Sequence, residues 1–102
     1  MNSRYSDKVY EIVKSIPNGY VTTYKEIAIK LGNKNLSRVV GNILHNNPNE
    51  DEIPCYKVVN SKGMVSTSFA FGGIDEHRKR LIEDGIVVVN NKVDLSIYLY
   101  KE

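Results

Sequence analysis

Residues 23–45 read TYKEIAIKLGNKNLSRVVGNILH and hold two short helical patterns separated by a glycine. Thr23 stands three residues before Glu26, which is the spacing of a capping box and predicts the start of the first helix. Gly32 is the expected C-terminal stop of that helix. Its inner face consists of Ile27, Ala28 and Leu31. Two short helices joined by a tight turn that contains glycine are typical of a helix-turn-helix.

The second helix of this pair has one apolar face and one polar face. Asn35 suits its N-cap, and Asn47-Pro48 predicts its end because the residue before a proline avoids helical conformations. Helical spacing puts five residues on the apolar face: Leu36, Val39, Val40, Ile43 and Leu44. The polar face holds Arg38, Gly41, Asn42 and His45. In a helix-turn-helix this second helix enters a groove of DNA. A three-helix core that binds nothing shows the same pattern, so the pattern alone leaves both interpretations open.

The segments around this pair predict further helices and a small amount of strand. In chain order we expect a helix over 4–16, a turn at 17–19, a β-prone segment at 20–22, a buried strand within 53–59, a turn at 60–63, a loop over 64–73, a helix over 74–84 and a β-hairpin over 86–95. A hairpin after the helices resembles a wing. The sequence therefore predicts one mostly α domain with small β elements over 1–102, a winged helix-turn-helix.

Composition excludes some classes of protein, and the charge is unevenly distributed. Hydrophobic residues make up 41% and charged residues 25%, as in ordinary globular domains. No apolar run approaches the roughly 20 residues that a membrane span needs, and no apolar stretch opens the chain as in a secretory signal. Residues 1–48 carry seven Lys and Arg against three acids, a balance of +4. This balance favours an anionic partner such as nucleic acid, although a solvated surface explains it equally well.

Cys55 is the one cysteine, and it stands between Pro54 and Tyr56. A thiol reacts as the thiolate, and a nearby cation lowers its pKa, so Lys57 is a candidate activator. A lone cysteine is also commonly inert packing. One cysteine cannot form an internal disulfide, which favours a reducing, intracellular setting. The separate histidines His45 and His77 do not complete a zinc site with it, so no metal is expected.

Four segments, in order and with matching spacing, resemble the C-terminal domain of O6-alkylguanine-DNA alkyltransferases and the alkyltransferase-like proteins. They are IPNGYVTTY followed by EIA over 16–28, SRVVG at 37–41, NP at 47–48 with IPCYKVV at 53–59, and EDG at 83–85 with VDLSIY at 93–98. The resemblance runs from about residue 5 to residue 100. One such motif is weak, but the ordered set is specific.

This resemblance implies that the protein binds double-stranded DNA containing O6-alkylguanine and flips the damaged base out of the stack. The residue at Arg38 would fill the gap, the residue at Tyr24 would help to rotate the nucleotide, and Cys55 would accept and keep the alkyl group. Asn47 would order the active-site turn. Further DNA contacts are implied at Thr23, Lys34, Ser37, Gly41 and Asn42. The base pocket would be formed by Tyr24, Pro54, Cys55, Val58, Ser68, Phe69 and Phe71. No cofactor is implied.

Three positions depart from the family pattern. Tyr56 replaces the active-site histidine, and Lys57 replaces the following arginine. Asp84 falls where the acidic partner of that histidine is expected, with Glu83 one residue earlier. Tyrosine, with an ordinary pKa near 10, is a poor base at neutral pH, so the proton relay from the thiol is altered.

Three functions follow as alternatives. The first is a single-turnover methylated-DNA–protein-cysteine methyltransferase, with Cys55, Tyr56, Asn47 and Asp84 as its catalytic residues. The second is a non-enzymatic alkyltransferase-like sensor that recruits nucleotide excision repair, since such proteins are short and lack the N-terminal domain of the larger alkyltransferases. The third is a plain winged-helix regulator. We expect a monomer that is cytoplasmic and DNA-associated, or nuclear in a eukaryote, and that has no membrane partner.

Overall fold

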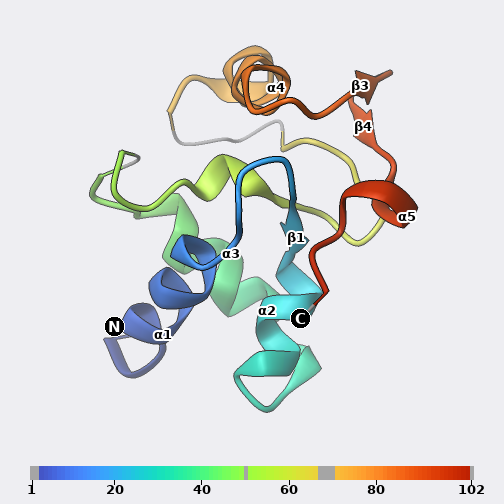
Figure 1. Ribbon diagram of the computed structural model, residues 1–102. Coiled ribbons are helices and arrows are strands. Elements are labelled where there is room, and N and C mark those ends of the chain that lie inside the picture. Colours follow the sequence, from blue (N-terminus) through green and yellow to red (C-terminus); the bar gives the residue numbers. More distant parts are fainter. Residues whose placement is uncertain (1–2, 50, 67–70, 102) are drawn as a thin grey trace.

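The computed structural model describes residues 3–49, 51–66 and 71–101, and most of their regular structure is helical (Figure 1). The α-helices are α1 Ser3–Lys14, α2 Tyr24–Lys30, α3 Ser37–His45, α4 Gly73–Glu83 and α5 Leu95–Tyr98. Two short 3₁₀ helices are η1 Lys34–Leu36 and η2 Cys55–Lys57. The strands are β1 Thr22–Thr23, β2 Val58–Val59, β3 Val88–Val89 and β4 Lys92–Val93. The predicted mostly α fold with small β elements is confirmed.

The helix-turn-helix consists of α2, η1 and α3. The hydroxyl of Thr23 accepts a hydrogen bond from the Glu26 amide at 3.0 Å, which caps α2 as predicted. Gly32 follows α2 with a φ of +101°, a conformation that suits glycine at a helix end. The predicted N-cap at Asn35 is wrong. The side chain of Asn33 instead accepts from the Asn35 amide at 2.9 Å and begins η1, so α3 starts only at Ser37.

The core is divided into two clusters, and β2 lies between them. The first cluster packs α1, α2 and α3 together with the segment around Cys55, and the second packs α4 with the hairpin. β2 pairs in parallel with β1, with Thr22 opposite Val58 and Thr23 opposite Val59. Val58 belongs to the first cluster and Val59 to the second, because successive side chains of a strand point to opposite faces. In Figure 1 the segment η2–β2 accordingly runs between the three N-terminal helices and α4.

The wing is the antiparallel hairpin β3–β4, with Val88 opposite Val93 and Val89 opposite Lys92. Asn90 and Asn91 both have positive φ, as in a type I′ turn, so the predicted hairpin is confirmed, although it is shorter than expected. The predicted buried strand within 53–59 is also shorter, because Cys55–Lys57 form the η2 turn instead.

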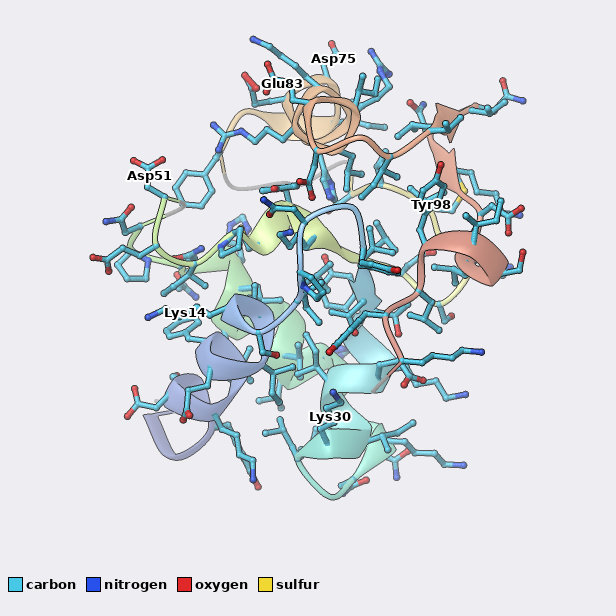
Figure 2. The ribbon with its side chains drawn as sticks, in the orientation of Figure 1. Lys14, Lys30, Asp51, Asp75, Glu83 and Tyr98 are labelled. Atoms are coloured by element: carbon cyan, nitrogen blue, oxygen red, sulfur yellow. The ribbon has the colours of Figure 1, made fainter. Side chains whose placement is uncertain are left out.

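The sequence interpretation missed α5. Asp94 caps this helix by accepting from the Ser96 amide at 2.9 Å. The Tyr98 side chain points toward the residues before the hairpin, where its hydroxyl accepts from the Val87 amide at 3.2 Å (Figure 2). After α5 the chain returns to Val21, whose amide donates to Tyr98 O at 2.8 Å and whose carbonyl accepts from the Tyr100 amide at 2.9 Å. Within the described residues, no helix is both long enough and apolar enough to cross a membrane.

Candidate nucleic-acid interface and base pocket

A pocket of about 550 Å³ opens where the polar face of α3 meets the cysteine. Tyr24 at the start of α2 and Cys55 of η2 both line it. From α3 come Ser37, Arg38, Gly41, Asn42, Leu44 and His45, and the remaining lining residues are Ser66 and His77. The volume lies within the roughly 300–1,000 Å³ of small-molecule sites. The structure therefore brings part of the predicted DNA-contacting set to one cavity with the thiol, but not Thr23 or Lys34.

Cys55 is fixed in the pocket wall by a tight turn. Pro54 has φ −75° and ψ 72°, and the Cys55 amide donates to Ile53 O at 2.7 Å, which makes an inverse γ-turn. The Asn47 side chain donates to the same carbonyl at 2.7 Å, while its own oxygen accepts from the Asn49 amide at 2.9 Å. Asn47 thus makes the kind of ordering contacts that the family resemblance implies. The Cys55 side chain packs against the three-helix cluster, and the residue is 6% exposed.

Tyr24 is a half-buried phenol at the edge of the pocket. Burial raises the pKa of Tyr24, the electrostatic effect of Cys55 raises it further, and a hydrogen bond with the Ser66 side chain lowers it. The net shift is upward, so the phenol keeps its proton at neutral pH and remains able to donate a hydrogen bond. Tyr24 also borders a second depression next to Lys34 and Ser37.

The outer face of α3 is open to solvent beside the pocket. Arg38 and Asn42 are exposed. A side chain added at Gly41 would meet nothing within 4 Å, so this glycine leaves free space on the face that is predicted to approach DNA. Lys34 is exposed on η1. Thr23, by contrast, is buried and its hydroxyl is used as the cap of α2, so its role inside the protein is structural.

Lys57 does not face the cysteine, which corrects the prediction that its cation activates the thiol. Its ammonium donates at 3.1 Å to Pro17 O, to Asn18 Oδ1 and to Asp84 Oδ2. These three bonds use all three of its donors. The Lys57 and Asp84 side chains are 3% and 8% exposed, and Asp84 also accepts from the Gly19 amide at 3.2 Å.

Asp84 and Tyr56 consequently lie on the other side of η2 from the pocket. Asp84 is paired with Lys57, and both residues border a separate depression that Tyr56, Pro54 and Glu83 also line. The Tyr56 ring lies 5.6 Å from the Lys57 ammonium and packs against both core clusters. Figure 2 shows Glu83 with Asp75 on α4, away from Lys14 on α1 and Lys30 on α2. A direct catalytic part for Tyr56 and Asp84 stays a prediction.

The other predicted pocket residues are distributed differently. Val58 is a core residue, 1% exposed, and does not line the cavity. Phe71 is half-buried and packs against the three-helix cluster. Ser68 and Phe69 lie outside the described residues.

Sequence reasoning missed His77 and Ser66. His77 is 1% exposed, accepts at Nδ1 from the Ser66 amide at 3.0 Å, and lies with Nε2 2.7 Å from Tyr56 O. Burial lowers the pKa of His77 below its ordinary value of 6.5, and the hydrogen bond with the backbone of Tyr56 opposes part of this shift. Ile74, His77 and Leu81 repeat at helical spacing, and this periodicity could have shown that His77 points inward.

A helix-turn-helix whose second helix presents an exposed polar face beside a ligand-sized pocket defines a DNA-binding protein. Sequence comparison specifies the family of DNA-binding proteins. The family "6-O-methylguanine DNA methyltransferase, DNA binding domain" matches residues 4–86, and the chain belongs to this family.

Similar proteins include enzymes and proteins named for base flipping. A bifunctional methyltransferase/endonuclease of Picrophilus torridus is 39% identical over 92 residues, which are 90% of this chain but only 30% of that protein. A DNA base-flipping protein of Escherichia coli is 35% identical over 97 residues, covering 92% of this chain and 72% of that one. The crystal structure of S. pombe Atl1 with damaged DNA containing O6-carboxymethylguanine superposes with a TM-score of 0.89 at 31% identity, covering 100% of this chain and 99% of that chain.

Proposed function

We propose that this protein recognises O6-alkylguanine in duplex DNA by rotating the base out of the stack into the pocket beside Cys55. The observation that carries this proposal is the convergence of Tyr24, the polar face of α3 and Cys55 on one cavity. A flipped base needs a concave site next to the groove-binding helix, and extruding it costs a few kcal/mol. The O6-carboxymethylguanine in the DNA bound by the similar S. pombe protein supports the choice of ligand.

The named residues have separate tasks in this proposal. Arg38 is exposed at the pocket rim and occupies the space that the extruded base leaves in the duplex. Gly41 allows the helix to approach the backbone closely because no side chain intervenes. Tyr24 crowds the phosphate of the target nucleotide and, as a protonated phenol, offers a hydrogen bond.

A second, finer proposal is that Cys55 takes the alkyl group. Sγ of the thiolate would attack the alkyl carbon, the bond from that carbon to guanine O6 would break, and guanine would leave after taking up a proton, to which Tyr24 can contribute. The presence of the thiol in the pocket wall favours this reaction. The Lys57 ammonium, however, is bonded to Asp84 and does not assist thiolate formation, so a slow transfer is expected.

Recruitment of a repair nuclease is the alternative outcome if the alkyl group stays on the base. Nucleotide excision repair is the system that the family resemblance implies. The Picrophilus torridus relative, a bifunctional methyltransferase/endonuclease, supports a link between damage recognition and strand cleavage.

The test combines binding with intact-protein mass spectrometry. Wild type and Cys55→Ser are incubated with a duplex containing one O6-methylguanine and with the same duplex containing guanine. Damage-selective binding by both proteins, with a gain of one methyl by wild type alone, supports recognition and transfer. Selective binding without mass gain supports recognition alone and removes the transfer step. Equal affinity for the two duplexes contradicts the proposed function.

A further inference from the structure

His77 lies at the point where three separate segments of the chain meet. It is on α4, one of its nitrogens contacts η2 and the other contacts Ser66. It is 1% exposed, and it also lines the pocket that contains Cys55 and Tyr24. A histidine so deeply buried has to satisfy both ring nitrogens inside the protein.

The two hydrogen bonds specify one tautomer. The Ser66 amide can only donate, so Nδ1, at 3.0 Å, must carry a lone pair and accept. The proton of the neutral ring is then on Nε2, which donates to Tyr56 O at 2.7 Å. A doubly protonated ring could not accept from Ser66. The observed contacts therefore require the neutral form, and burial favours that form by lowering the pKa of His77.

These contacts connect the two functional ends of the pocket. Tyr56 directly follows Cys55 in η2, so its carbonyl is part of the turn that presents the thiol. The side chain of Ser66, whose amide bonds to His77, is hydrogen-bonded with Tyr24. A continuous path thus runs from Tyr24 through Ser66 and His77 to the turn that carries Cys55.

We propose that His77 is a positioning residue that holds Cys55 and Tyr24 at a fixed separation, and that it does so only as the neutral Nε2–H tautomer. The inference rests on the proposed function, since it concerns the pocket that receives the base. Proton uptake by His77 breaks its bond with the Ser66 amide, loosens the path to Tyr24 and weakens recognition of the damaged base.

Other charged groups surround His77 and have to be separated from it in any pH experiment. From α3, Arg38 and His45 line the same pocket, as do Cys55 and Tyr24. On η2, Lys57 is paired with Asp84. On α4 itself, Arg80 pairs with Glu76 at 3.5 Å and Arg78 with Asp75 at 2.9 Å. Among these, His45 is the other imidazole, and these two are the only histidines of the chain.

The experiment therefore uses His45→Gln as the background, in which His77 is the one remaining imidazole. Imidazole ¹⁵N shifts are recorded from pH 8 to pH 5. At each pH the affinity ratio between the O6-methylguanine duplex and the undamaged duplex is measured at constant salt. The ratio cancels changes that act on DNA binding in general.

We expect an unprotonated Nδ1 and a protonated Nε2 at neutral pH, and a selectivity ratio that falls about tenfold as His77 takes up its proton. His77→Gln in the same background should lower the ratio at pH 7.5 and make it independent of pH. The opposite tautomer, a charged ring at pH 7.5, or a ratio that stays constant through the titration would overturn the inference. If that glutamine variant does not fold, the titration of His77 itself decides.

Failure of the proposed function has a different signature. It shows as a selectivity ratio of one at every pH, whatever the state of His77. In that case the ring signals of Tyr24 decide the positioning role: if they shift together with the His77 titration the role stands, and if they do not move it is rejected.

Discussion

Two polar clusters lie on opposite sides of η2, and they differ in charge and in access to solvent. The neutral cluster consists of Tyr24, Ser66, His77 and the carbonyl of Tyr56, and it borders the pocket. The ionic cluster consists of Lys57 and Asp84 with Asn18 and the backbone of residues 17 and 19. Lys57 and Tyr56 stand where the family pattern has an arginine and a histidine. Both side chains lie on the side of η2 that carries the ionic cluster.

This difference shows which polar groups can serve a reaction. The Lys57 ammonium has its three donors occupied, and the Asp84 carboxylate is bonded to two partners, so neither can exchange partners without cost. A neutral imidazole can change its state by taking up one proton. We infer that the ionic cluster stabilises the fold and that the neutral cluster adjusts the pocket, and the following variants can break or sharpen this distinction.

The largest effect is expected from Lys57→Met. It leaves the Asp84 carboxylate buried without its cation, which typically costs about 3–5 kcal/mol of unfolding free energy. Urea unfolding of the purified variant measures this loss. Asp75→Asn is the control, because it breaks an exposed ion pair within α4, the helix that Asp84 follows, and such a pair is worth at most about 1 kcal/mol. Equal losses in both variants would show that the ionic cluster has no special structural role.

Arg38→Ala should weaken binding of the damaged duplex about tenfold while leaving the unfolding free energy nearly unchanged. Arg38 is exposed at the rim of the pocket, on the side of the neutral cluster. A gel-shift titration at fixed salt measures the change. Lys14→Ala removes a charge of the same sign from α1, outside the pocket, and should have a much smaller effect. Unchanged affinity of the Arg38 variant would remove its role in filling the vacated stack.

A smaller effect is expected from acidification. The pKa of His77 is lowered in the folded protein, so below pH 6.5 the unfolded chain binds a proton that the native state does not. The contribution of His77 to the unfolding free energy is therefore fully present above about pH 6.5 and is lost as the pH falls toward the pKa of the folded state. The loss is at most about 1.4 kcal/mol per pH unit. Urea unfolding of His45→Gln at pH 7.5 and pH 5.5, compared with His45→Gln/His77→Gln, isolates this slope. Equal slopes would mean that His77 is not held neutral.

The smallest effect is expected from Asn91→Gly in the hairpin turn. Glycine suits the positive φ of this position and should stabilise the turn by about 0.5 kcal/mol. The substitution also removes the hydrogen bond from Arg78 Nη1 to Asn91 Oδ1 at 2.7 Å, which connects the hairpin turn to α4, the helix that carries His77. We expect a net change below about 1 kcal/mol by thermal unfolding. Asn91→Ala keeps the strain of the positive φ and also loses the hydrogen bond with Arg78. It should therefore be clearly less stable than Asn91→Gly.

The sequence predicted those features that depend on neighbouring residues. Thr23 and Gly32 delimit α2 because capping and left-handed stops are decided within a few residues, and Asn90-Asn91 specify the hairpin turn for the same reason. The choice between Asn33 and Asn35 as a cap failed because either side chain fits the local pattern. The family resemblance led to Cys55 and Arg38, which line one pocket.

The contacts of the two clusters could not be predicted, because they join distant parts of the chain. Lys57 reaches Pro17 and Asp84, which are 40 and 27 positions away, and His77 reaches Tyr56 over 21 positions. Local pattern contains no information on which side of η2 Lys57 lies. The prediction that Lys57 lies beside the thiol was based on its nearness to Cys55 in the sequence. It is wrong because the ammonium bonds to Pro17, Asn18 and Asp84 instead.

The return of the chain to Val21 has a consequence for synthesis. During translation the helix-turn-helix emerges well before α5, but the backbone groups of Val21 find their partners only when Tyr98 and Tyr100 have left the ribosome. Until then the backbone of Val21, next to β1, is an unpaired edge, the kind of surface that promotes association between nascent chains. The helix-turn-helix therefore waits for residues far downstream, and a chain cut short before Tyr98 would leave this backbone unpaired.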